Sequence, residues 1–142
     1  MFSDSTIDRE SIQAYLETEY CVQGDTPATL KIGIANGTLA ALHKAHSVES
    51  SAFVTACNPF SQSFDDALNA NRQAALAVEL RARSLTFIDG IGQHPSNLWK
   101  GEPSFLVMGV SREAAKALGV RHEQNAIVWC GPDAVPQLVL LR

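Results

Sequence analysis

The sequence predicts an α+β fold in which helices pack on a single mixed β-sheet. Its 142 residues are close to the usual size of one domain, and 46% of them are hydrophobic, enough to form one core. Helical and strand periodicities alternate along the first half of the chain, and pairs of strands follow in the second half. The expected order is therefore helix, strand, helix, strand, helix, strand, strand, helix, strand, strand.

An acidic helix is expected at the N-terminus. Residues 1–25 contain six acidic residues and one basic residue, a net charge of −5, whereas residues 26–142 carry +1. We therefore divide the chain into an acidic N-terminal helix at 1–25 and a single α+β domain at 26–142. The acidic face is either a solvated surface or a contact for a basic protein partner. The helix itself is predicted from a narrow stripe of apolar side chains at Ile7, Ile12, Tyr15, Leu16 and Tyr20.

The following elements alternate between strand and helix. Leu30, Ile32 and Ile34 alternate with polar or small residues, which is the period of a strand. Asn58-Pro59 ends a short β-prone run, and Ser63 is suited to the N-cap of a long helix. The expected elements are a strand at 28–35, a helix at 38–46, a strand at 52–57 and a helix at 64–83.

A fifteen-residue connection at 90–104 is expected after the next strand. It is rich in Gly, Pro and polar side chains, and structureless connections of this length are often functional. Gly131-Pro132-Asp133 predicts a turn between the last two strands. The expected elements are strands at 84–89 and 105–110, a helix at 111–118 that ends at Gly119, and strands at 126–130 and 137–141.

The long helix carries a polar side chain on its predicted apolar face. With Phe64 placed at 0° and about 100° per residue, Asn71 lies at about 340°, among Ala, Leu and Val side chains. A buried amide without partners costs about 1–3 kcal/mol. We therefore expect Asn71 to bond to the backbone near Asn58, to another polar side chain or to a ligand. Asn71→Ala is expected to lower the free energy of unfolding by about the same amount.

The fifteen-residue connection supplies the candidate catalytic residues, Glu102 and His94. Pro103 restricts Glu102 to an extended conformation at the mouth of a strand, where its carboxyl group can act as a general acid or base. A general base there would have its pKa raised by burial. A structural carboxylate bonded to Lys100, Arg72 or backbone N–H groups would have its pKa lowered, and this second alternative is the expected one.

Cofactor, metal and nucleic-acid sites are not expected. Gly90-Ile91-Gly92 lacks the third glycine and the following helix of a dinucleotide site, and no compact metal-ligand spacing occurs. The net charge of −4 argues against a nucleic-acid partner. No run of 18 apolar residues predicts a membrane span. The N-terminus does not match a signal peptide, and three widely spaced cysteines are typical of reduced thiols, so we expect a cytoplasmic protein.

An ordered set of motifs resembles a bacterial family of unknown function, domain of unknown function 3293. The set comprises Thr55-Ala56-Cys57-Asn58-Pro59, Asn71 with Leu76 and Leu80, Gly90-Ile91-Gly92, Trp99-x-Gly101-Glu102-x-Ser104 and Gln124-Asn125-Ala126. The resemblance runs from about residue 27 to the C-terminus and brings no known activity. It implies that Asn58, Asn71, Glu102 and Gln124 belong to the polar motif set of the family. The family pattern has Trp where this chain has Cys57, so it implies no thiol nucleophile there.

These residues lead to three hypotheses on function. In the first, Asn58, Asn71, Glu102 and Gln124 form a polar pocket that binds a small polar or nucleotide-like ligand, and Trp99 stacks on it as a lid or anchors the loop. In the second, the protein is an enzyme with Glu102 as general acid or base, assisted by His94. In the third, the polar groups form a buried network in a structural or partner-binding protein. A fully bonded set without a cleft would favour the third hypothesis.

Overall fold

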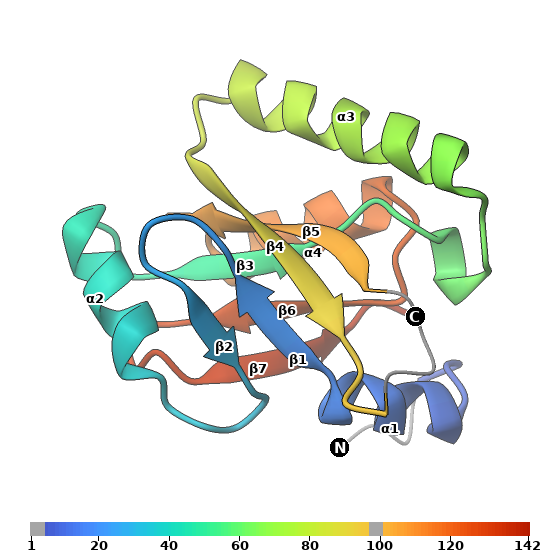
Figure 1. Cartoon of the computed structure of the whole chain (residues 1–142), viewed down its shortest axis with the longest axis horizontal. Helices are drawn as coiled ribbons and strands as arrows, with labels where there is room; N and C mark the ends of the chain where they lie inside the picture. The colour runs from blue at the N-terminus through green and yellow to red at the C-terminus, as the bar shows by residue number, and fades with distance from the viewer. Residues whose placement is uncertain (1–4, 97–100) are drawn as a thin grey trace.

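The protein folds around one curled seven-stranded β-sheet with four α-helices packed on it (Figure 1). The computed structural model describes residues 5–96 and 101–142. The strand order is β2-β1-β4-β5-β3-β6-β7. The strands are β1 (Glu19–Val22), β2 (Ala28–Leu30), β3 (Ser51–Val54), β4 (Phe87–Gln93), β5 (Glu102–Met108), β6 (Ala126–Cys130) and β7 (Pro136–Leu140).

Each helix begins at a side chain that caps its first turn. Asp8, Asn36, Asp65 and Ser111 each accept a hydrogen bond from the backbone N–H three residues further on, which satisfies a free donor of the helix N-terminus. None of the helices in the described residues is long and apolar enough to cross a membrane. The helices are α1 (Arg9–Glu17), α2 (Gly37–Ala45), α3 (Asp66–Ala82) and α4 (Arg112–Arg121), with a short 3-10 turn η1 (Pro59–Ser61) before α3.

The structure confirms the α+β class, the single sheet and the order of the helices, but the sheet is antiparallel rather than mixed. Every pair of neighbouring strands in it runs antiparallel. The additional strand β1 occupies a segment that was predicted to end the first helix. Tyr20 and Val22 face the core while their neighbours are half-buried, and Tyr20 pairs with both Leu30 and Gly92. The helix prediction is therefore wrong beyond Glu17, where α1 ends.

Several element boundaries differ from those expected. β2 ends at Leu30, because Gly33 turns the chain with a φ of 83°. β4 extends to Gln93 and β5 begins at Glu102, so eight residues separate them rather than fifteen. Helix α4 continues past Gly119, where a Cβ atom would lie 2.5 Å from a Leu141 methyl carbon. Glycine at this position lets the helix pack closely on the end of the sheet.

The sheet separates two hydrophobic clusters. Successive residues of β3 point to opposite faces, so Phe53 packs in the cluster beneath α2 and Val54 in the cluster beneath α3 and α4. Leu39 of α2 and Leu76 of α3 are both fully buried. The sheet is therefore covered on both faces, and the end of its strands at which β3 ends and β5 and β6 begin faces α1 (Figure 1).

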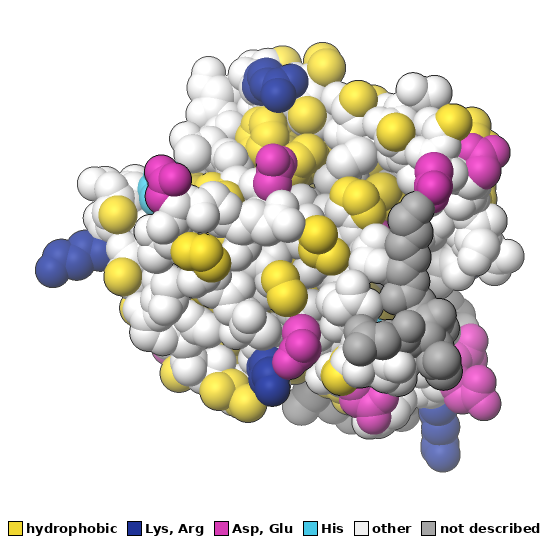
Figure 2. Space-filling view, viewed as in Figure 1, with side chains coloured by type: hydrophobic (Ala, Val, Ile, Leu, Met, Phe, Trp, Pro, Cys, Tyr) yellow, Lys and Arg dark blue, Asp and Glu magenta, His cyan; other side chains and the backbone are white. Residues whose placement is uncertain are grey.

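The predicted buried position of Asn71 is wrong, because α3 turns the opposite face to the sheet. Asn71 is exposed, and so are Leu68 and Val78, at 48% and 63% of their surfaces. Figure 2 shows hydrophobic side chains gathered over α3 on the outside of the molecule. Phe64, the reference of the prediction, precedes the helix, which starts at Asp66. The buried face instead holds Gln73, Leu76, Ala77 and Leu80.

Candidate functional site

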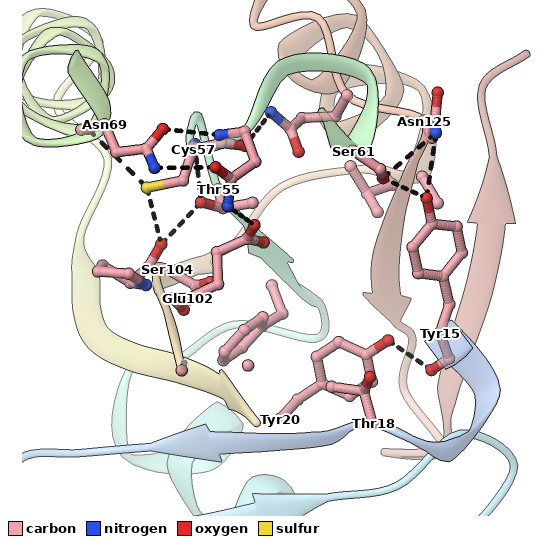
Figure 3. A pocket seen from close by; sticks show the side chains of 18 of the residues that line it. Tyr15, Thr18, Tyr20, Thr55, Cys57, Ser61, Asn69, Glu102, Ser104 and Asn125 are labelled. Atoms are coloured by element: carbon pink, nitrogen blue, oxygen red, sulfur yellow. Dashed lines mark hydrogen bonds between the residues drawn. The ribbon is translucent and has the colours of Figure 1, made fainter. Parts of the chain in front are cut away.

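A cavity of about 1030 Å³ opens at the end of the sheet where β3 ends and the neighbouring strands β5 and β6 begin. Its floor is formed by strands of the sheet, and its walls by α1, by the η1 segment and by the first turns of α3. Figure 3 shows Glu102 and Asn69 on one side of it and Tyr15, Ser61 and Asn125 on the other. Sites for small molecules typically have this size and this mixture of apolar walls and a few polar groups.

Asn58 connects three segments at this cavity. It follows β3 with a φ of 48°, a left-handed conformation that Asn adopts more readily than most residues. Its Oδ1 accepts hydrogen bonds from the Phe64 N–H at 3.0 Å and from Asn69 Nδ2 at 2.9 Å. Its backbone N–H donates to Asn69 Oδ1 at 2.8 Å, and its Nδ2 donates to Glu102 Oε2 at 2.9 Å. The amide therefore holds η1, α3 and β5 together.

Glu102 lies in the cavity at the first residue of β5, and its environment raises the pKa of its carboxyl group. Burial away from water is the main cause, and the hydrogen bond from Asn58 opposes it in part. Among the described residues, Asn58 supplies its one hydrogen bond, and neither a cation nor a backbone N–H reaches it. Arg72 instead donates to the carbonyl oxygens of Ala56 and His122, at 2.7 and 2.9 Å. The expected structural carboxylate with a lowered pKa is therefore wrong.

Gln73 on α3 orders the chain just after β3. Its Oε1 accepts hydrogen bonds from the Ala56 N–H at 2.9 Å and from Thr55 Oγ1 at 3.4 Å. Because the Ala56 N–H is a donor, the amide oxygen must face it, which fixes the orientation of the Gln73 amide. Its Nε2 is buried and has no partner among the described residues. Such an unpaired donor lowers the free energy of unfolding by about 1–3 kcal/mol, and here it lies beside the cavity.

Gln124 contacts the same segment from the β6 side of β3, opposite to β5. It lies just before β6 and is buried, and its Nε2 donates to the carbonyl oxygens of Cys57 and His122, both at 3.1 Å. Asn58, Glu102 and Gln124 are thus brought together around residues 57–58, as the sequence predicted for a polar cluster. Asn71 does not take part in this cluster. Asn69 and Gln73, on the opposite face of α3, provide the amides instead.

Helix α1 closes the opposite wall of the cavity through hydroxyl groups. The Tyr15 and Ser61 hydroxyls share a hydrogen bond of 2.5 Å, and Asn125 Nδ2 donates to the Tyr15 oxygen at 3.1 Å. The Tyr20 hydroxyl donates to the Tyr15 carbonyl at 2.6 Å, and burial raises the pKa of Tyr20. These contacts fix the acidic helix to η1, β1 and β6, so its inner face forms part of the cavity wall.

His94 lies at the rim of the cavity and pairs with the acidic helix. Its Nε2 is 3.1 Å from Glu17 Oε1, and its Nδ1 is 2.8 Å from Ser96 Oγ. The pKa of Glu17 is lowered, mainly by the Gln13 hydrogen bond and also by His94. The geometry gives His94 a partner on α1, and no hydrogen bond joins it to Glu102 in the described residues. Trp99, the predicted stacking lid, lies outside the described residues.

Cys57 lines the cavity as a buried thiol. Burial raises the pKa of this thiol, and its Sγ lies 3.6 Å from the Pro103 carbonyl oxygen and 3.9 Å from that of Asn69. A thiol in such surroundings is protonated and a poor nucleophile. No group of three or more His, Cys, Asp or Glu side chains in the described ranges is arranged to hold a metal ion.

Comparison with known proteins places the chain in a family. No curated protein and no solved structure matches it. The family model described as "Protein of unknown function (DUF3293)" matches residues 54–127, just over half of the chain. The matched range begins in β3 and ends in β6, and it contains Asn58, Glu102 and Gln124 together with the whole of α3. The resemblance indicated by the sequence motifs is thus confirmed, and the protein belongs to the DUF3293 family.

Proposed function

We propose that the protein binds a small polar ligand in the cavity between α1, α3 and the ends of strands β3, β5 and β6. The observation that carries the proposal is the Glu102 carboxyl group, which lies in a cavity of about 1030 Å³ with one hydrogen bond from the described residues. A carboxyl group that served only to stabilise the fold would be expected to have its bonding capacity filled, because burying an incompletely bonded polar group is costly. Its second oxygen is available to a ligand.

The surrounding residues have distinct roles in this proposal. Glu102 contacts the ligand, and Asn58 holds the Glu102 carboxyl group in place. Gln124 supports the site indirectly, because its hydrogen bond holds the backbone at Cys57 and does not reach Glu102. Trp99 remains a predicted stacking residue. The three cysteines are free and widely spaced, in keeping with our proposal that the protein works in the reducing cytoplasm.

A second candidate function is catalysis with Glu102 as general acid or base. The raised pKa of Glu102 favours it, because general acids and bases work best when their pKa lies near the working pH. His94 is less suited to act beside it, since its ring nitrogens already pair with Glu17 and Ser96. In this case the ligand of the first proposal is the substrate, and both functions use one site.

The experiment uses a matched pair of tryptophan variants. Ala70 lines the cavity on the exposed surface of α3, so Ala70→Trp should obstruct part of the cavity without disturbing the core. Ala74 is exposed one turn later and does not line the cavity, so Ala74→Trp is the control. A library of small polar metabolites is screened by thermal shift, and binders are confirmed by amide NMR. We expect binders that are lost in Ala70→Trp and retained in Ala74→Trp. No binders, or binders unaffected by Ala70→Trp, would contradict the proposal.

A further inference from the structure

The charges around the cavity are one-sided. Of the residues that line it in the described part of the chain, Glu102 and Asp66 are acidic and none is Lys or Arg. Arg142 comes near the cavity through Asn125, whose Oδ1 accepts a hydrogen bond from its Nη1 at 3.3 Å, and its guanidinium group lies over the Phe60 ring. The described walls therefore offer no Lys or Arg to a phosphate or carboxylate, and His94, which also lines the cavity, already pairs with Glu17.

The N-terminus of α3, which meets the cavity, is already occupied by acidic side chains. A helix N-terminus attracts anions through its free N–H groups and its dipole. Here Asp65 Oδ1 accepts a hydrogen bond from the Leu68 N–H at 2.8 Å, and Asp66 stands in the first turn. These two carboxylates offset the positive end of the helix dipole, so the helix N-terminus does not offer a phosphate group a binding site in place of Lys or Arg.

The carboxyl group of Glu102 is oriented for an incoming donor. Asn58 Nδ2 bonds to Oε2, while Oε1 has no hydrogen bond from any described residue. Because Asn58 is itself held by Phe64 and Asn69, the carboxyl group cannot easily turn away. An N–H donor on a ligand can approach Oε1 from the cavity, and a charged donor would form the stronger bond.

Aromatic side chains complete the walls. Tyr15, Tyr20, Phe53 and Phe64 all line the cavity, and Tyr20 packs edge-on against Phe53 with a ring-centroid distance of 5.3 Å. Aromatic faces attract organic cations, with about 0.5–2 kcal/mol for each well-placed contact. A cavity that contains both a carboxyl group and aromatic side chains is suited to a cation carrying an apolar body.

We propose that the ligand of this cavity is a small organic cation, an amine, amidine or guanidinium compound, which pairs through its N–H groups with Glu102. This inference rests on the proposed binding function and narrows it. It favours a cation over the nucleotide-like alternative of the sequence analysis, since a phosphate group would find no Lys or Arg among the described lining residues.

The test is a series of ligands of nearly equal size that differ in charge. Binding of benzamidine and benzylamine is compared with that of neutral benzamide and anionic benzoate, by calorimetry and amide NMR at about pH 8, because alkaline pH favours the ionised form of the Glu102 carboxyl group. We expect the cations to bind at least about tenfold more tightly than benzamide, and benzoate to bind least. The changes in protein amide shifts caused by the cations should be largest at Asn58, Glu102 and Tyr20.

Two variants separate the site from general charge attraction. Glu102→Gln keeps the size of the side chain and can still accept the Asn58 hydrogen bond, so we expect it to abolish the preference for cations. Glu113→Gln removes the same charge from the exposed surface of α4 and should leave the preference unchanged. The wild-type ligand series needs no variant, so it decides the question even if Glu102→Gln folds poorly.

The possible failures are distinguishable. If benzamide or benzoate binds in the cavity as tightly as the cations, the inference is wrong and the proposed binding function stands. If no member of the series binds but Ala70→Trp abolishes the binding of library compounds, the inference is again wrong and the proposed binding function again stands. If neither the series nor the library yields a compound sensitive to Ala70→Trp, both the inference and the proposed function fail.

Discussion

Replacement of Asn58 by alanine is the change whose cost can be worked out most fully from the structure. It removes three side-chain hydrogen bonds, those with the Phe64 N–H, with Asn69 Nδ2 and with Glu102 Oε2. At about 0.5–1.5 kcal/mol each, these bonds give about 1.5–4.5 kcal/mol. The Phe64 N–H is exposed and can turn to water, and Asn69 Nδ2 keeps the Phe64 carbonyl at 3.2 Å, so the lower half of this range applies.

The backbone of Asn58 adds to that cost. Its φ of 48° is left-handed, and alanine there loses about 1 kcal/mol that asparagine and glycine do not. We therefore expect Asn58→Ala to lower the free energy of unfolding by about 2.5–4 kcal/mol, and Asn58→Gly by about 1 kcal/mol less. Urea denaturation followed by circular dichroism measures both values, and a typical slope predicts a midpoint lower by about 1–2 M for the alanine variant.

The control is Asn71→Ala on the outer face of α3. Asn71 is exposed, so its replacement by a better helix former should change the free energy of unfolding by less than about 0.5 kcal/mol. The sequence alone predicted the opposite, a loss of about 1–3 kcal/mol at Asn71. Equal stability of Asn58→Ala and the wild type, or a larger loss in Asn71→Ala than in Asn58→Ala, would refute the reasoning about both residues.

Three further predictions concern titration, thiol reactivity and packing. Burial raises the pKa of Glu102 in the folded state above its usual 4.5, so the contribution of the protonated carboxyl group to stability is complete below pH 4.5 and is lost as pH rises through the folded-state pKa. Glu102→Gln should therefore gain stability relative to the wild type as pH rises through this range. Denaturation midpoints with the same pH dependence in both proteins would contradict this. Timed alkylation with mass spectrometry should modify the half-exposed Cys21 well before Cys57, whose buried thiol has a raised pKa, and equal rates would argue against the burial of Cys57. Gly90→Ala should destabilise by at least about 1–3 kcal/mol, since its Cβ would lie 2.8 Å from the Cys21 carbonyl oxygen, whereas Gly37→Ala, with open space around it, should be nearly neutral in thermal denaturation.

The general plan of the fold was predictable from local patterns, and the details of pairing were not. The alternation of helical and strand periodicity predicted one sheet with helices on it, because each element carries its own hydrophobic pattern. β1 was missed because Tyr20 continues the helical stripe of α1, and a four-residue strand is too short to show a period of its own. The antiparallel arrangement depends on contacts between distant segments, such as Phe53 with Leu106 and Val128, which periodicity cannot reveal.

The candidate site was predictable in part for the same reason. Asn58, Glu102 and Gln124 each stand at the end of a predicted strand, and the sheet brings these ends together. The α3 contribution was misassigned because the prediction took its phase from Phe64 and from a run of alanines. Leu76 and Leu80, spaced four apart, form the buried face instead, and the same face extends back by three residues to Gln73 and by four more to Asn69.

The central claim is that Glu102 presents a partly buried and incompletely bonded carboxyl group to a cavity, and its titration tests this claim most directly. Carboxyl carbon NMR of the free protein, with Glu102→Gln used to assign the resonance, gives the pKa of this single group. Burial predicts a pKa above the usual 4.5, and saturation with benzamidine should lower it, because a bound cation favours the ionised form. A pKa at or below 4.5 in the free protein would show that the carboxyl group is solvated or already paired, and would contradict the account.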